Sequence, residues 1–270
     1  MILFPNCKIN LGLNITGKRS DGFHDLETVF YPVALNDALE IIPAADGKFE
    51  FQSTGLPIPG EVRSNLCVKA FHLLKLKLKL PAVKIHLHKV IPIGSGLGGG
   101  SSDGAFTLKL LNILFETGLS NNRLEEYARL LGSDCAFFIS NKPVYAHGRG
   151  DRFEPVGTDL SGMYLVLVFP DFQISTAEAF SMVIPVSPAP GLNDLIRLPI
   201  EQWKDRLVND FEKPVFEKYP GLGVIKQQLF SIGAVYAGMS GSGSSIYGIF
   251  VDKPVVKSHL PENNFVIIPL

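Results

Sequence analysis

The chain has 270 residues, of which 46% are hydrophobic and 19% charged, so it holds enough apolar material for one large or two ordinary domains and too little charge for a disordered polyelectrolyte. Its 25 basic and 26 acidic residues nearly cancel, which argues against nucleic acid or an anionic membrane surface as a partner. The three cysteines are widely spaced and form no CxxC pair, a pattern that predicts reduced thiols in a cytoplasmic protein and argues against a zinc or disulfide framework.

The beginning of the chain alternates strand-like runs with turns. Residues 1–8 contain an early proline and no long apolar stretch, so neither a signal peptide nor a membrane-spanning segment is predicted. Apolar, β-rich runs predict strands at residues 8–15, 26–34 and 38–42, with a polar loop at 17–24. Their spacing implies antiparallel pairing.

A helix and a further strand come next. Ser64 can cap a helix that runs through Leu66, Ala70, Leu73 and Leu74, and the basic alternation at residues 75–80 would end it with its lysines in solvent. Residues 83–90 alternate as a half-buried strand. His86 and His88 share one face of that strand. No third ligand at a suitable spacing accompanies them, so they do not predict a metal site.

The most informative segment is the glycine-rich run at residues 92–103. Five of the seven residues 94–100 are glycine, and an apolar helical pattern follows at 105–115. Glycine permits positive φ angles and lets backbone N–H groups approach an anion, while the first turn of a helix adds unpaired N–H donors and a positive dipole end. The run therefore predicts a phosphate-binding loop, with an ordinary flexible turn as the alternative.

Three well-known glycine loops fit this run poorly. The spacing of Gly94, Gly96 and Gly99 satisfies a dinucleotide fingerprint, but the acidic residue required about 20 positions later at a strand end is missing, because Glu116 falls at the tail of a helical pattern. A Walker A loop requires Lys where Gly100 stands. A protein-kinase loop joins two strands, whereas a helix is predicted here.

A second helix is predicted from Asn121 or Asn122 to Leu131. It ends at Gly132, and a sharp turn then places Asp134 next to a very apolar segment.

The second half of the chain starts a new alternation of strands and helices. Residues 149–155 are predicted to form a turn region, and strands are predicted at 164–169 and 265–268. We therefore expect a boundary near residue 156. A second Gly/Ser cluster at residues 237–250 lies between β-like runs, and taken alone it is equally well explained as a tight hairpin turn.

Residues 6–12, 92–103 and 237–250, in this order, resemble the three motifs of the GHMP kinase superfamily of small-molecule kinases. The resemblance covers essentially the whole chain. Four segments narrow it to the branch that phosphorylates a cytidine-diphosphate-linked methylerythritol, namely residues 8–11, 17–28, 64–66 and 131–138.

The resemblance implies a mixed α/β (α+β) fold of two domains. A nucleotide-binding domain would span residues 1–155 and a ferredoxin-like domain residues 156–270, with the active site in the cleft between them. It also implies ATP with Mg²⁺ as the donor, transfer of the γ-phosphoryl group to the 2-hydroxyl of the methylerythritol unit in non-mevalonate isoprenoid biosynthesis, and a monomer or weak homodimer.

Phosphoryl transfer needs an oriented hydroxyl, a proton acceptor and compensation of the γ-phosphate charge. By resemblance Asp134 is the acceptor and Lys8 is the cation that orients both Asp134 and the hydroxyl, although without the family Asp134 is more often a helix cap. Ser101 and Ser102 are the candidate Mg²⁺ ligands. The expected ATP-binding residues are Asn65, Leu66, Pro92, Gly94, Ser95, Gly96, Leu97, Gly98, Gly99, Gly100, Ser101 and Ser102.

The expected acceptor-binding residues lie on both halves of the chain. Asn10 shares a strand face with Lys8. Phe23 and His24 resemble the family's cytosine-recognition pair, although the family usually has Tyr where this chain has Phe23. Phe180 sits where a second stacking aromatic is expected, or it is a core residue. A further family-like segment that begins at residue 209 has no assigned role.

Three other functions remain as alternatives. Another kinase of the superfamily, acting on homoserine, mevalonate or a sugar, has no evident use for the aromatic pair at Phe23 and His24. A nucleotide-binding module without catalysis needs neither Lys8 nor Asp134. A dinucleotide-dependent oxidoreductase lacks its acidic residue.

Overall fold

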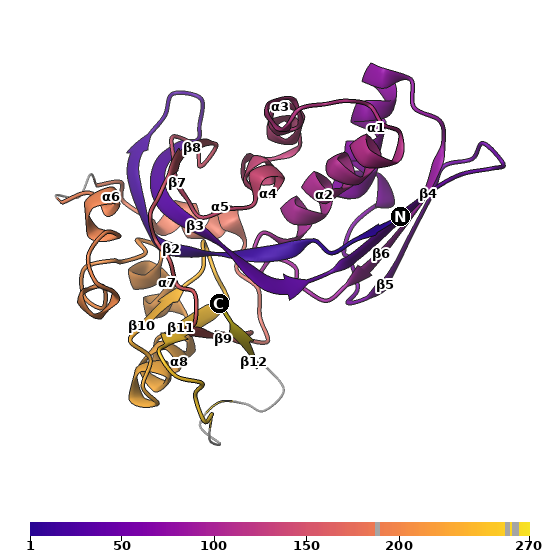
Figure 1. Ribbon diagram of the computed structural model, residues 1–270. Coiled ribbons are helices and arrows are strands. Elements are labelled where there is room, and N and C mark those ends of the chain that lie inside the picture. The colour runs from indigo at the N-terminus through magenta and orange to yellow at the C-terminus, as the bar shows by residue number, and fades with distance from the viewer. Residues whose placement is uncertain (187–189, 257–259, 261–264) are drawn as a thin grey trace. The chain divides into compact units, whose positions relative to one another are not determined.

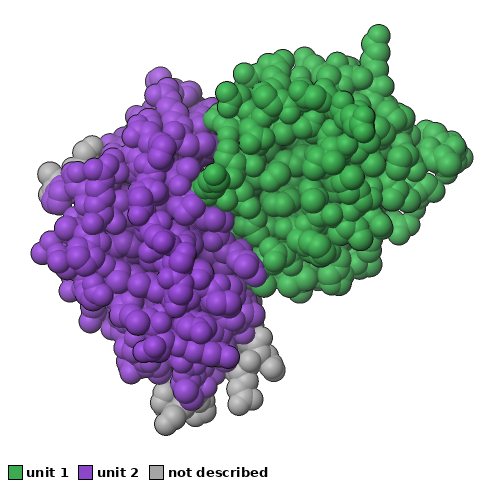
Figure 2. All heavy atoms as spheres, in the orientation of Figure 1, with its two compact units in different colours: residues 1–7, 35–93, 98–142 green, residues 8–34, 94–97, 143–270 purple. Residues whose placement is uncertain are grey.

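Three four-stranded sheets with their helices make up the computed structural model, which describes residues 1–186, 190–256, 260 and 265–270 (Figure 1). The chain divides into two compact units that interleave along the sequence (Figure 2). Unit 1 contains residues 1–7, 35–93 and 98–142, and unit 2 contains residues 8–34, 94–97 and 143–270. Most of the two long N-terminal strands therefore falls in unit 2, so these units differ from the division at residue 156, which stays a prediction about domains.

Unit 1 is built on a sheet with the order β1-β4-β6-β5. Its strands are β1 (Ile2–Leu3), β4 (Ala38–Pro43), β6 (Val83–Lys89) and β5 (Glu50–Gly55), of which β5 runs parallel to β6. The alternation along β6 buries every second side chain, and the helices α1 (Leu66–Leu78) and α2 (Gly99–Leu114) lie beside this sheet (Figure 1). The remaining elements of unit 1 are η1 (Val62–Ser64), α3 (Asn121–Leu131), η2 (Ser133–Ala136) and α4 (Phe137–Ser140).

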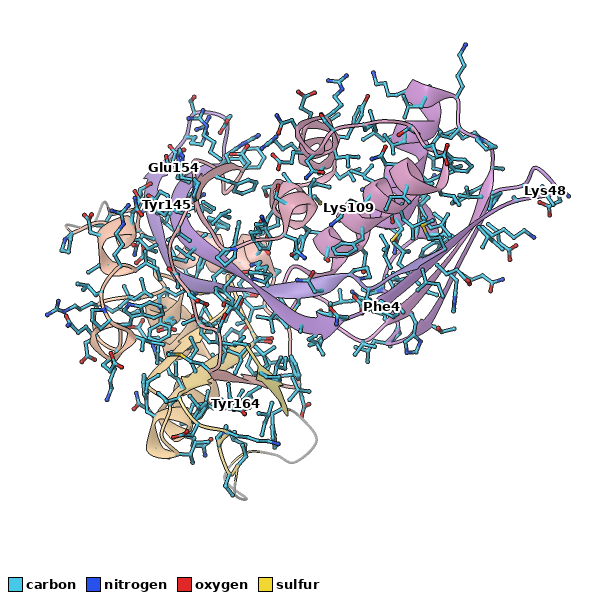
Figure 3. The ribbon with its side chains drawn as sticks, viewed as in Figure 1. Phe4, Lys48, Lys109, Tyr145, Glu154 and Tyr164 are labelled. Carbon is cyan, nitrogen blue, oxygen red and sulfur yellow. The ribbon has the colours of Figure 1, made fainter. Side chains whose placement is uncertain are left out.

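Unit 2 holds the sheet β10-β11-β9-β12 and most of the sheet β2-β3-β7-β8. In the latter, the antiparallel register of β7 on β8 sets Tyr145 opposite Glu154 (Figure 3). The strands are β2 (Asn6–Lys18), β3 (His24–Asn36), β7 (Val144–His147), β8 (Arg152–Pro155), β9 (Tyr164–Val168), β10 (Tyr236–Met239), β11 (Ile246–Phe250) and β12 (Phe265–Pro269). The helices are α5 (Thr176–Met182), α6 (Leu192–Leu195), η3 (Ile200–Gln202), α7 (Glu212–Lys218) and α8 (Pro220–Ser231).

Most of the elements predicted from periodicity are confirmed, and three are corrected. The cap of α1 is Asn65, whose side chain accepts from the Cys67 N–H at 2.8 Å, whereas the Ser64 hydroxyl bonds back to Glu61. Helix α2 begins at Gly99, before its apolar pattern starts. Residues 152–155 form β8 because they pair with β7 instead of turning. Across the described residues, no helix has the length and apolar character that crossing a membrane requires.

Candidate active site

The glycine-rich loop connects β6 to α2 and needs glycine for two separate reasons. Gly94, Gly96 and Gly98 have φ angles of 67°, 78° and 70°, which L side chains adopt only with strain. Space is also short, because a Cβ atom on Gly96 would lie 1.9 Å from the Ser240 carbonyl oxygen. At these glycine positions the loop therefore presents backbone atoms and disfavours side chains.

The loop runs straight into the N-terminus of α2. Gly98 is the N-cap and has no side chain to satisfy the first helical N–H groups, and the first backbone bond of the helix runs from Ser102 to Gly98 at 2.9 Å. Unpaired N–H groups and the positive end of the helix dipole favour an anion at this point. The predicted arrangement of a glycine loop followed directly by a helix N-terminus is thus present, and phosphate binding there stays a prediction.

A pocket of about 220 Å³ lies in unit 1 at the start of α2. Both residues predicted for the adenine side, Asn65 and Leu66, line it, and Gly100 of the loop lines it as well. Asn65 thus both caps α1, by accepting from the Cys67 N–H, and lines the pocket.

Lys8 is buried in unit 2 beside the first half of the loop. Its Nζ donates to Asn10 Oδ1 and, at 2.9 Å, to the Gly96 carbonyl, and its own N–H donates to the Leu97 carbonyl at 3.0 Å. Asn10 is held in turn by Thr28, whose Oγ1 accepts from Asn10 Nδ2 at 3.0 Å. The structure therefore brings the first and second motifs together.

The second Gly/Ser cluster joins the same assembly. It forms the connection of the antiparallel hairpin β10–β11, so the simple hairpin interpretation is confirmed as topology. Its Ser240 hydroxyl donates to the Gly96 carbonyl at 3.0 Å, and the Ser245 N–H donates to the Ser95 carbonyl at 3.1 Å. These two hydrogen bonds hold the hairpin against the glycine loop.

Asn209, to which the sequence assigned no role, fixes this hairpin. Its buried Nδ2 donates to the carbonyls of Met239 and Gly241, each at 2.8 Å. The neighbouring Asp210 accepts from the Ile15 N–H on β2 at 2.7 Å. Local pattern carries no sign of these bonds, since their partners lie far away in the chain.

Asp134 lies half-buried in η2, the sharp turn predicted from the sequence. The residues after it, Cys135 to Ile139, are buried, and burial raises the pKa of the Cys135 thiol to about 12. The predicted apolar surroundings are confirmed. Asp134 lies in unit 1 and Lys8 in unit 2, so their pairing and the role of Asp134 as a base stay predictions.

The aromatic residues predicted to bind cytosine are all in unit 2. The rings of His24 and Phe180 are stacked with centroids 4.8 Å apart, and Phe180 meets Phe211 edge-on at 4.9 Å. Phe23 is 56% exposed, and the Arg149 guanidinium lies over its ring at 5.2 Å. The structure therefore pairs Phe180 with His24 and Phe23 with Arg149.

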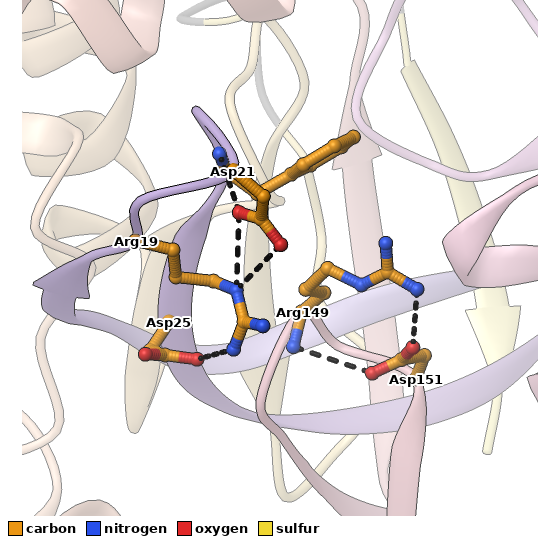
Figure 4. Close-up of polar contacts among 6 residues, drawn as sticks. Arg19, Asp21, Asp25, Arg149 and Asp151 are labelled. Carbon is orange, nitrogen blue, oxygen red and sulfur yellow. Dashed lines mark hydrogen bonds and ion pairs between the residues drawn. The ribbon is translucent and has the colours of Figure 1, made fainter.

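Charged side chains fix the loop that carries Phe23 (Figure 4). Asp21 accepts from the Phe23 N–H at 3.1 Å and from Arg19, which also pairs with Asp25 at 2.9 Å. The Phe23 N–H bond lowers the pKa of Asp21, with Arg19 acting in the same direction. The exposed ring is thus presented on an ordered turn.

A magnesium ion would find oxygen ligands at the start of α2. The described residues contain no cluster of three or more His, Cys, Asp or Glu side chains arranged for a metal, and Mg²⁺ in kinases is commonly held by one or two protein oxygens together with substrate phosphates. The Ser102 Oγ is buried without a hydrogen-bond partner. Ser102 therefore fits the role predicted for it, and the role of Ser101 stays a prediction.

The chain matches two families, the GHMP kinases N terminal domain over residues 65–142 and the GHMP kinases C terminal over residues 193–263. It is 56% identical over 252 residues to the 4-diphosphocytidyl-2-C-methyl-D-erythritol kinase of Bacteroides fragilis, covering 93% of this chain and 92% of the relative. The relative of the same name in Cytophaga hutchinsonii is 52% identical, with 94% of each chain covered.

Solved structures agree with these relatives. A crystal structure of 4-(cytidine 5'-diphospho)-2C-methyl-D-erythritol kinase superimposes with a TM-score of 0.76 at 31% identity, over 92% of this chain and 89% of that one. The Methanococcus jannaschii mevalonate kinase superimposes with a TM-score of 0.69 at 14% identity, over 93% of this chain and 90% of that one. The second likeness shows the shared fold.

Proposed function

The chain belongs to the 4-diphosphocytidyl-2-C-methyl-D-erythritol kinases, a branch of the GHMP kinases, and from this membership we propose that it transfers the γ-phosphoryl group of ATP to the 2-hydroxyl of 4-diphosphocytidyl-2-C-methyl-D-erythritol. The observation that carries the proposal is the 56% identity over 93% of the chain. The convergence of Lys8, the glycine loop and the Ser240 hairpin supports it independently.

ATP is held by the glycine loop and the pocket beside it. The N–H groups at the start of α2 bind the phosphates, and Asn65 and Leu66 border the space for adenine. Ser101 and Ser102 would hold Mg²⁺, which neutralises charge on the β- and γ-phosphates when bound.

The chemical step is an in-line displacement at the γ-phosphorus. The substrate 2-hydroxyl oxygen forms the new bond to phosphorus, the bond from phosphorus to the β–γ bridging oxygen breaks, and ADP leaves. Asp134 accepts the hydroxyl proton, and Lys8 compensates the negative charge that gathers on the transferred group. Asn10 fixes the Lys8 ammonium through its Oδ1.

The cytidine end of the acceptor is bound by the aromatic residues of unit 2. Phe23 stacks on the cytosine ring, and His24, whose ring is stacked on that of Phe180 in the structure, reads the polar edge of the base. Phe180 is the candidate for the second aromatic surface. We place the reaction in the cytoplasm, in line with three buried cysteines that form no disulfide, and expect a monomer or weak homodimer.

A coupled assay of ADP release tests the proposal. The purified protein is given ATP and, one at a time, 4-diphosphocytidyl-2-C-methyl-D-erythritol, homoserine, mevalonate and galactose. We expect turnover with the cytidine-linked acceptor alone. Faster turnover with any of the other three acceptors would contradict the proposed function.

A further inference from the structure

Three ionisable side chains that are distant in sequence meet in the interior of unit 1. Asp37, Lys89 and Asp103 are 1%, 2% and 3% exposed. Lys89 Nζ forms an ion pair with Asp37 Oδ2 and a second one with Asp103 Oδ2 at 2.9 Å. Burying one cation with two carboxylates carries a large desolvation penalty. A contribution to stability is therefore not a sufficient explanation for such a cluster.

Two members of this ion cluster flank the phosphate loop in the chain, and Asp37 is bonded to the residues at its start. Lys89 is the last residue of β6, which leads into the loop. Asp37 accepts through its Oδ1 from the N–H groups of Val90 and Ile91, the first two residues after that strand, the second at 2.9 Å. Asp103 lies in α2, which follows the loop. The cluster therefore joins the strand that enters the loop to the helix that leaves it.

The Lys89 ammonium also packs against the first residue of α2. A Cβ atom on Gly99 would lie 2.9 Å from Lys89 Nζ and 2.8 Å from a methyl group of Ile91. Burial alone would lower the pKa of Lys89, but the charges of Asp103 and Asp37 outweigh it and keep that pKa above its ordinary value. The charged ammonium group of Lys89 thus lies beside Gly99, the first residue of α2.

We propose that Asp37, Lys89 and Asp103 are positioning residues, which hold the entry and exit of the phosphate loop together and so present its N–H groups to the triphosphate of ATP. The loop is rich in glycine and loses much conformational freedom when it is ordered. Ends that are fixed beforehand reduce the part of this loss that ATP binding must overcome. The inference rests on the proposed function, since it requires ATP at the loop.

Two substitutions at one position, whose side chains have the same number of non-hydrogen atoms, test this role. In Asp103→Asn the amide oxygen can accept from Lys89, and its nitrogen takes the place of Asp103 Oδ1, which has no hydrogen-bond partner. Asp103→Leu removes the acceptor. Both variants leave Lys89 paired with Asp37. By calorimetry with a non-hydrolysable ATP analogue, we expect Asp103→Leu to weaken binding about tenfold, or about 1.4 kcal/mol, and Asp103→Asn to weaken it less than about threefold.

Adenosine binding separates positioning from direct contact, because Asp103 also borders the pocket lined by Asn65. If Asp103 positions the phosphate loop, Asp103→Leu should weaken binding of the ATP analogue and leave the affinity for adenosine unchanged. Equal weakening of both ligands, or of neither, would overturn the inference. The matched control is Glu125→Leu, which removes the ion pair with Arg129 on α3 and the acceptor of the Ser140 hydroxyl on α4 of the same unit and should leave ATP affinity unchanged.

A measurement on the wild-type protein keeps the inference testable if Asp103→Leu does not fold. Amide hydrogen exchange should show the N–H groups of Val90 and Ile91 already protected without nucleotide. If they exchange freely until ATP binds, the ends of the loop are not held beforehand and the inference is wrong. A wild-type protein that binds no ATP analogue would instead refute the proposed function, and the two failures are therefore distinguishable.

Discussion

Gly96→Ala is the substitution that most directly tests the architecture of the phosphate loop. The new Cβ atom would lie 1.9 Å from the Ser240 carbonyl oxygen, 3.0 Å from its carbon and 3.2 Å from the Gly243 oxygen. All three are backbone atoms, so no side-chain rotation relieves the overlap. The φ angle of 78° adds strain of its own. The hairpin must therefore move away from the loop.

The two penalties can be estimated separately. A left-handed backbone angle costs an L residue about 1–2 kcal/mol, and displacing packed structure costs about 1–3 kcal/mol, so Gly96→Ala should lower the free energy of unfolding by roughly 2–5 kcal/mol. Urea unfolding followed by circular dichroism measures this value. The control is Gly221→Ala, in α8 with open space around it. This substitution should raise the free energy of unfolding by about 0.5–1 kcal/mol. If Gly96→Ala were as stable as the wild type, the hairpin would not support the loop in solution.

Further predictions concern the catalytic base, the acceptor and a buried thiol. Asp134→Asn should lower kcat about 10²- to 10⁴-fold with unchanged calorimetric affinity for an ATP analogue, and near-native kcat would show that another group takes the proton. Phe23→Ala should raise the acceptor KM roughly ten- to a hundredfold, since aromatic–base stacking contributes about 1–3 kcal/mol, while Phe23→Tyr is tolerated and the KM for ATP is constant. Equal changes in both KM values would make Phe23 a structural residue. The Cys135 thiol, with its pKa raised from 9.0 to about 12 by burial, holds less thiolate than an ordinary thiol near neutral pH and should react with a disulfide reagent only after unfolding. Rapid labelling of Cys135 in the folded protein would contradict its burial.

Local periodicity was sufficient for two strands and two helices of the first half of the chain. The alternation in β2 and β6 and the apolar spacing in α1 and α3 are confirmed at nearly the expected residues. The start of α2 could not be found this way, because Gly99 to Ser102 have no apolar rhythm and become helical only through their place between the loop and the helix. The cap of α1 depends on backbone angles that adjacent polar residues do not reveal.

Contacts between distant residues set the limit of the sequence-based prediction of the site. Asn209 was visible as part of a family-like segment, yet its bonds to Met239 and Gly241 depend on how the chain returns to β10. His24 and Phe180 were predicted for one pocket, but their stacking on each other depends on the packing of α5 in unit 2. A residue type predicts which interaction is needed, whereas the partner is chosen by the tertiary structure.

The ion cluster of Asp37, Lys89 and Asp103 is only partly indicated by the sequence. The alternation of residues 83–90 puts Lys89 on the same face as Val83, Ile85 and Leu87, which is the buried face. A lysine on that face requires a carboxylate, because an unpaired buried cation is strongly unfavourable. This alternation is a signal for a counter-charge at the entrance to the phosphate loop, although that expectation is not among the sequence-based predictions. It could not show that two carboxylates meet Lys89 there, nor that Asp103, on the far side of the loop, is one of them, and this second pairing is what allows the cluster to fix the ends of the loop.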